Sequence, residues 1–189
     1  MQNASISTFM SGRNQPSLIV IGTGAPAVAV DGPTGYSAIE TNGSGLISHR
    51  LDRPMSAGKF YWELLYASGV LPGVTNEPFT HHDYAGWTTG KNSLVYSAGW
   101  SSRNWASTEE NLSPEPDPGD RIGFMFDADT KTMSFRTNAA AASVSHDLSA
   151  RAGPFFAVFG WQVGPGSGNE IRLGEAGCLY PPPAGYDYL

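Results

Sequence analysis

The sequence has little cysteine, little charge and no long apolar run, and each shortage narrows the range of functions. Cys178 is the single cysteine, which excludes an intrachain disulfide and a multi-cysteine metal site. Charged residues make up only 15% of the chain, and its lysines and arginines are scattered, so no basic stripe is available for a phosphate backbone. No apolar run approaches the roughly 20 residues of a membrane span. We therefore expect neither nucleic-acid binding nor a membrane span.

The first residues also lack the apolar segment of a secretory signal peptide. Residues 1–16 are polar and follow no clear period, which favours an N-terminal arm that becomes ordered only where it docks. Residues 17–189 are expected to form one domain, because a chain of 189 residues suffices for one well-buried core and is marginal for two.

Glycine, proline and aromatic residues are what the chain has in abundance. It contains 23 glycines and 14 prolines, which are too closely spaced for long helices, while a hydrophobic content of 40% argues against disorder. Many short strands joined by Gly/Pro turns account for both facts. We predict an all-β fold, a bent two-layer antiparallel β-sandwich with little helix.

Residues 59–66 (KFYWELLY) form the clearest predicted strand. Phe60, Trp62 and Leu64 alternate with Tyr61 and Glu63, and both faces are largely apolar. This pattern predicts a central strand that is covered on both sides. Further strands are predicted at residues 17–21, 27–30, 36–40, 45–49, 84–88, 93–96, 121–126, 132–137, 155–161 and 170–173.

Two hairpins and two long loops organise these strands. Residues 36–40 and 45–49 are expected to pair around an Asn-Gly turn, which is a strong hairpin signal. Residues 121–126 and 132–137 are expected to pair around a short polar turn. Residues 67–83 and 97–119 are rich in turn-forming residues, so we expect them to be loops.

Three short motifs resemble catalytic or ligand-binding sequences, but turn chemistry explains them better. Residues 22–27 (GTGAPA) match a dinucleotide fingerprint, yet no helix follows them to face a pyrophosphate. Asp127 and Asp129 resemble a phosphatase nucleophile loop, yet they lie in the turn of a predicted hairpin. His81, His82 and Asp83 are adjacent, and adjacent side chains diverge too much to share a metal ion. We expect no catalysis, no cofactor and no metal.

Tryptophans in long polar connections are the better functional signal. Trp62 and Trp87 lie on predicted strands and are expected in the core, whereas others lie in loops or at strand ends. Tryptophan and arginine are enriched at binding hot spots, although such side chains can instead plug the end of a sandwich. The candidate partner-binding residues are Asp83, Tyr84, Trp100, Arg103, Trp105 and Trp161.

Three sequence blocks carry a resemblance to a known family. Residues 56–63 (SAGKFYWE) are similar to an SGKxYWE strand, and residues 118–138 match a GDxIGxxxD…SFxxN block. Residues 153–158 (GPFFAV) follow in the same order as a GPxxPAV strand. Together these blocks resemble the SPRY/B30.2 domain family. The resemblance covers about residues 27–189, although Ala139 replaces an expected glycine and residues 84–87 match loosely.

The resemblance implies a SPRY or concanavalin-like sandwich whose loops at one end bind a protein or peptide, without catalysis. The ending at residues 180–186 (YPPPAGY) is similar to SPRY-like domains of bacterial and bacteriophage proteins. The resulting hypothesis is a virion component of a phage, used in head decoration, fibre or tail assembly, stabilisation or host attachment. Its partners would be other virion subunits or copies of itself. Its location would be the virion if a phage encodes it, and the cytoplasm otherwise.

Three alternatives remain open at this point. A carbohydrate-binding, lectin-like module would use the aromatic loops to stack on a surface glycan. An intracellular SPRY-type adaptor would bind a protein in the cytoplasm. An enzyme would require Asp127 to act on a phosphate ester, which the hairpin reading argues against.

Overall fold

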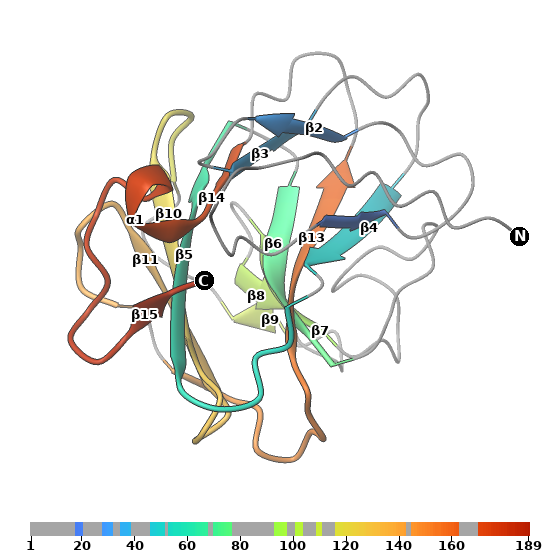
Figure 1. Ribbon diagram of the computed structural model, residues 1–189, viewed down its shortest axis with the longest axis vertical. Coiled ribbons are helices and arrows are strands. Elements are labelled where there is room, and N and C mark those ends of the chain that lie inside the picture. Colours follow the sequence, from blue (N-terminus) through green and yellow to red (C-terminus); the bar gives the residue numbers. More distant parts are fainter. Residues whose placement is uncertain are drawn as a thin grey trace, which may run out of the picture.

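The computed structural model describes residues 18–20, 28–31, 35–38, 46–51, 53–67, 70–76, 93–97, 101–103, 109–110, 116–142, 145–162 and 170–189. These residues form two β-sheets that face each other, accompanied by one short helix, α1 (Gly174–Gly177) (Figure 1). The expected all-β, two-layer sandwich is confirmed.

The first sheet, sheet A, has the strand order β1–β4–β13–β6–β7–β8–β9, with antiparallel neighbours. Its strands are β1 (Leu18–Val20), β4 (Leu46–Leu51), β6 (Val70–Thr75), β7 (Ser93–Ser97), β8 (Ser101–Arg103), β9 (Glu109–Glu110) and β13 (Phe156–Gln162). β13 lies between β4 and β6, so a strand from late in the sequence joins two early ones.

The second sheet, sheet B, has the order β12–β11–β10–β5–β14–β3–β2. Its strands are β2 (Val28–Asp31), β3 (Gly35–Ala38), β5 (Lys59–Leu65), β10 (Arg121–Asp127), β11 (Thr132–Thr137), β12 (His146–Asp147) and β14 (Glu170–Arg172). A further strand, β15 (Asp187–Tyr188), pairs in parallel with β5. The predicted hairpin of residues 121–126 and 132–137 is confirmed by the β10–β11 pairing.

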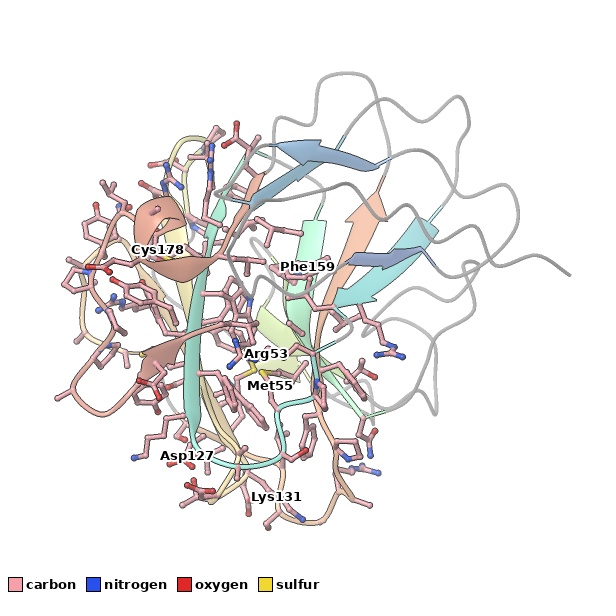
Figure 2. The ribbon with its side chains drawn as sticks, in the orientation of Figure 1. Arg53, Met55, Asp127, Lys131, Phe159 and Cys178 are labelled. Carbon is pink, nitrogen blue, oxygen red and sulfur yellow. The ribbon has the colours of Figure 1, made fainter. Side chains whose placement is uncertain are left out.

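The core lies between the two sheets. The Trp62 ring from sheet B is fully buried and stacks on Phe124, with ring centroids 5.3 Å apart. Val74 and Phe159 from sheet A belong to the same buried cluster, and Figure 2 shows Phe159 near the centre of the molecule. Burying an aromatic side chain of this size stabilises the fold by about 1.5–3 kcal/mol. The expectation that Trp62 is a core residue is confirmed.

β5 is the central strand that its sequence predicts. β10 pairs with its whole length on one edge, while β14 and β15 share the other edge. Phe60, Trp62 and Leu64 are buried with the core between the sheets, and Tyr61 and Glu63 on the opposite face are fully buried as well. Both faces are therefore covered, as the alternation predicts.

The predicted hairpin of residues 36–40 and 45–49 is wrong. β3 lies in sheet B, where it pairs with β2 and β14, whereas β4 lies in sheet A between β1 and β13. An Asn-Gly sequence specifies a local turn, but it does not decide which strands pair. Here the chain passes from one sheet to the other between the two strands.

The two predicted loops, residues 67–83 and 97–119, are also wrong in part. β6 lies in the first, where Pro72 and Gly73 suggest a turn. Both residues are buried and pair with β13, and Gly73 also pairs with β7. The pairing of β6 with these two strands outweighs the local preference for a turn. β8 and β9 lie in the second. They are short and polar at the end of the sheet order, so they carry no alternation that a sequence pattern could reveal.

Candidate partner-binding surface

Of the six candidate partner-binding residues, two have a described backbone. Arg103 is the last residue of β8, and Trp161 lies near the end of β13. Asp83, Tyr84, Trp100 and Trp105 lie outside the described residues, as do the predicted core residue Trp87 and the arm of residues 1–16. The role of all six as partner contacts therefore stays a prediction.

The strand register nevertheless fixes where the connections that carry these residues begin and end. β6 finishes at Thr75, opposite the first residue of β7, Ser93, and opposite the first residue of β13, Phe156. Arg103 pairs with Val95 near this end. We call it the Thr75 end of sheet A. The connection that holds Asp83 and Tyr84 is anchored here by β6 and β7.

The connection that holds Trp105 is anchored at the same end. It leaves β8 at Arg103 and enters β9 at Glu109, and these two residues are register partners. Arg103 is thus one anchor of the connection that carries Trp105, and it pairs with β7, the strand at which the connection that carries Asp83 and Tyr84 ends. Strand pairing alone brings these attachment points together.

Trp100 and Trp161 belong to the opposite end of sheet A. The connection that contains Trp100 joins Ser97 to Ser101, which are register partners at the far end of β7 and β8. Trp161 pairs with Ile47 and with Val70, the first residue of β6. We call this the Val70 end. The six candidates therefore divide between two ends of one sheet.

The Thr75 end adjoins a well-defined rim of turns. Asn76, directly after β6, donates its side-chain amide to the carbonyl of Ala152 at 2.7 Å. The backbone N–H of Met55 donates to the carbonyl of Phe155, also at 2.7 Å, and joins the segment before β5 to the start of β13. In Figure 2, Asp127 and Lys131 lie at the same lower end of the molecule.

The turn of the β10–β11 hairpin uses both of its aspartates structurally. One carboxylate oxygen of Asp127 accepts the backbone N–H groups of Asp129 and Thr130, at 3.0 and 3.1 Å. Asp129 accepts the N–H of Gly58 at 2.9 Å, and Gly58 has a positive φ of 86° that suits glycine. The expected turn between residues 121–126 and 132–137, with Asp127 bonding local backbone N–H groups, is confirmed at these residues.

Lys59 and Asp127 form an ion pair with a nitrogen–oxygen distance of 3.2 Å. The hydrogen bond and the charge of Asp127 raise the pKa of Lys59 above its ordinary value. Partial burial opposes ionisation of Asp127, but hydrogen bonds from Thr130 and Lys59 outweigh it, so the pKa of Asp127 is lowered. Both groups are therefore held in their charged forms at neutral pH.

The base of the same hairpin is held by Asn138 and Asp120, which also belong to the second sequence block. Asn138, at a positive φ of 54°, donates its side-chain amide to Asp120 at 2.9 Å. Its side-chain oxygen accepts the backbone N–H of Arg121 at 3.0 Å. Asp120, Arg121 and Asn138, which belong to the second sequence block, thus hold the base of the hairpin together.

A polar network on the outer face of β5 is the feature that sequence reasoning missed. Glu63 is fully buried, and its carboxylate accepts three hydrogen bonds. They come from the Tyr61 hydroxyl at 2.7 Å and from the backbone N–H groups of Leu179 and Tyr180, at 2.7 and 2.9 Å. A charged residue in an apolar strand was the available signal, because a buried carboxylate requires partners.

Arg136 extends this network from β11. One of its terminal nitrogens donates to the Tyr61 hydroxyl at 2.7 Å and to the carbonyl of Pro181 at 2.6 Å, and its guanidinium lies 4.7 Å from the centre of the Tyr61 ring. Burial, together with the hydrogen bond to Glu63, raises the pKa of Tyr61 against the influence of Arg136, so the hydroxyl remains a donor.

In the part of the chain that the structure describes, no three His, Cys, Asp or Glu side chains lie close enough together to hold a metal ion. Within the same residues, no helix is long and apolar enough to cross a membrane. The fingerprint-like residues 22–27 and the run His81–His82–Asp83 fall outside the described ranges.

Comparison with known proteins identifies the family. The SPRY domain family matches residues 59–175, which is more than half of the chain. The SPRY domain of human HERC1 has a TM-score of 0.59 at 17% sequence identity, covering 77% of this chain and 90% of that one. A second human SPRY domain has a TM-score of 0.57 at 18% identity, covering 77% and 92%. No curated protein matches the sequence. The family match and the two-sheet fold together show that the chain belongs to the SPRY domain family.

Proposed function

We propose that this SPRY domain is a non-enzymatic protein-binding module whose partner docks at the Thr75 end of sheet A. The observation that carries the proposal is the strand register. Arg103 anchors the connection that holds Trp105, and it pairs with β7, the strand at which the connection that holds Asp83 and Tyr84 ends. Arginine, tyrosine and tryptophan are the residue types enriched at the centre of protein interfaces. SPRY domains are typically protein-interaction modules, which supports the same reading.

The partner in this proposal is another subunit of a bacteriophage virion or a second copy of the chain. The polar residues 1–16 support it, because such an arm can order on a neighbouring subunit and extend the interface. The bacterial-style ending at residues 180–186 points the same way. The protein would then act in head decoration, in a fibre or in the tail.

The test uses the two loop tryptophans as a matched pair. Structural proteins encoded beside this chain are purified and their binding to the full chain is measured by biolayer interferometry. Trp105→Ala and Arg103→Ala should each weaken binding by about thirtyfold or more, as expected for an interface hot spot. Trp100→Ala, whose connection is anchored at the Val70 end, should leave binding nearly unchanged.

Each other outcome rejects part of the proposal. Equal losses for Trp100→Ala and Trp105→Ala would reject the Thr75 end as the docking surface. Binding to a glycan array, lost in either tryptophan variant, would replace the protein partner by a carbohydrate. Turnover of a phosphate ester that disappears in Asp127→Asn would replace binding by catalysis.

A further inference from the structure

The last residues of the chain cover the outer face of β5, although most of them are themselves exposed or only half-buried. We call residues 178–189 the strap. After α1 the strap crosses Glu63 and returns as β15 to the lower half of the β5 edge, whose upper half is taken by β14 (Figure 1). Within it only Leu189 is buried, and Leu179 is 62% exposed. At its end, Leu189 joins the hydrophobic core and the Tyr188 ring meets the edge of the Tyr61 ring, with centroids 6.2 Å apart. Its first half is held by hydrogen bonds.

The hydrogen bonds that hold the first half of the strap go to the backbone of three consecutive residues, 179–181. The Glu63 carboxylate accepts the N–H groups of Leu179 and Tyr180, and Arg136 donates to the carbonyl of Pro181. The third residue is a proline, which has no N–H to satisfy. The Leu179 side chain points into solvent, so its identity adds little to the attachment.

The side chains that receive the strap come from sheet B. Tyr61 bridges Glu63 and Arg136 through its hydroxyl, and its ring lies beneath the guanidinium. Gly123 on the neighbouring strand makes room for them, since a Cβ there would lie 2.8 Å from the Tyr61 oxygen and 3.0 Å from Cγ of Arg136. An acceptor for two amides and a donor for one carbonyl thus stand ready on sheet B.

We propose that the outer face of β5 is a second peptide-binding site, separate from the Thr75 end of sheet A, which the strap fills in cis. Its ligand in trans is an extended peptide that offers two consecutive backbone N–H groups followed by proline. The covalently attached strap competes at an effective concentration on the order of millimolar, so a free peptide binds only after the strap has opened.

Opening of the strap is favoured over global unfolding by its composition. Local openings have low free energy where no fully buried side chains hold a segment, and residues 178–188 of the strap include none. Cys178 at its start is half-buried, and burial with the nearby charge of Glu63 raises the pKa of its thiol to about 12. As the single cysteine of the chain, it reports opening through its labelling by a thiol reagent.

The first experiment measures the labelling rate of Cys178 by N-ethylmaleimide in the full chain. Leu179→Pro removes one N–H that Glu63 accepts, and the preceding residue, Cys178, already has φ and ψ of −76° and 135°, which suit a residue before proline. Labelling should accelerate roughly ten- to a hundredfold, because the loss of one hydrogen bond to a charged group shifts the opening equilibrium of the strap by about that factor. Leu179→Ala keeps the N–H and should label at the wild-type rate.

The second experiment adds a fluorescent peptide with the sequence of residues 177–189 in which serine replaces the cysteine. It should bind the Leu179→Pro chain in fluorescence anisotropy and fail to bind the wild-type chain. Because a bound peptide keeps the strap displaced, it should not slow the labelling of Cys178 in the Leu179→Pro chain. Adding Glu63→Gln to Leu179→Pro should weaken peptide binding at least about tenfold, because one acceptor of the paired amides is lost.

Two results would overturn the proposal. If Leu179→Pro leaves the labelling rate unchanged, Glu63 does not hold the strap. If labelling accelerates but the peptide does not bind, the strap opens without uncovering a peptide site. Leu179→Pro lies in an exposed segment, so it tests the site even where Glu63→Gln alone prevents folding. Near-ultraviolet circular dichroism checks that the sandwich is intact in each variant.

Discussion

The two faces of β5 are both closed to solvent, but by different kinds of contact. On the inner face, Trp62 and its neighbours pack against aromatic and aliphatic side chains from both sheets. On the outer face, Glu63 and Tyr61 are equally buried, yet they are held by hydrogen bonds to Arg136 and to the strap. One strand therefore depends on shape on one side and on matched donors and acceptors on the other.

The difference matters because mutations on the two faces should affect stability in different ways. An apolar core tolerates exchange of one hydrophobic side chain for another of similar volume, and its cost grows with the size of any cavity. A buried polar network tolerates almost no loss of a partner, because the group left behind remains buried and unsatisfied. Damage to the inner face should therefore weaken the whole domain, and damage to the outer face should first release the strap.

The largest effect is expected from Trp62→Ala. The side chain is fully buried and stacked on Phe124, so its removal leaves a cavity between the sheets. The free energy of unfolding should fall by about 3–5 kcal/mol, measured by urea denaturation. Labelling of Cys178 should then follow global unfolding. Loss of the strap alone, with an unchanged unfolding midpoint, would contradict the role of the inner face.

A smaller and more local effect is expected from Gly123→Ala. The added methyl group must displace Tyr61 or Arg136, which loosens the network without touching the inner face. We expect a loss of about 1–3 kcal/mol, as for an overpacked site, and faster labelling of Cys178. Gly153→Ala is the control, because its Cβ would meet nothing closer than 3.6 Å. Equal losses in both variants would remove the special role of Gly123.

Much of the inner face could be predicted from the sequence, because its signals are local. Alternating apolar residues in β5, β10 and β11 identify strands whichever sheet they join. The failures lie where distant partners decide the structure. β3 pairs with β2 and β14 rather than with β4, and Pro72 and Gly73 lie inside β6 because β13 and β7 enclose them. No local pattern encodes these neighbours.

The outer face could not be predicted for the same reason. Leu179 is 116 positions from Glu63, and the contact uses a backbone N–H that every residue except proline possesses. The only local hints are a glutamate within an apolar strand and a glycine within another, Gly123. The candidate residues at the two ends of sheet A were found by residue type, whereas their division between the ends depends on strand register.

The smallest effect is expected at the ion pair between Asp127 and Lys59, the first residue of β5. Asp127 joins Lys59 to the hairpin turn, and its lowered pKa means that folding favours its ionised form. Asp127→Asn should cost about 1 kcal/mol at neutral pH. This contribution is fully present above the ordinary carboxyl pKa of 3.8 and is lost as the pH falls from 3.8 through the lower folded-state value, so the difference between the variant and the wild type should begin to shrink below about pH 4. Lys59→Gln should cost less, because the backbone bonds from Asp129 and Thr130 remain. Urea denaturation at pH 7, 5 and 3 measures both. A difference between Asp127→Asn and the wild type that is as large at pH 3 as at pH 7 would show that the turn depends on the shape of Asp127 rather than on its charge.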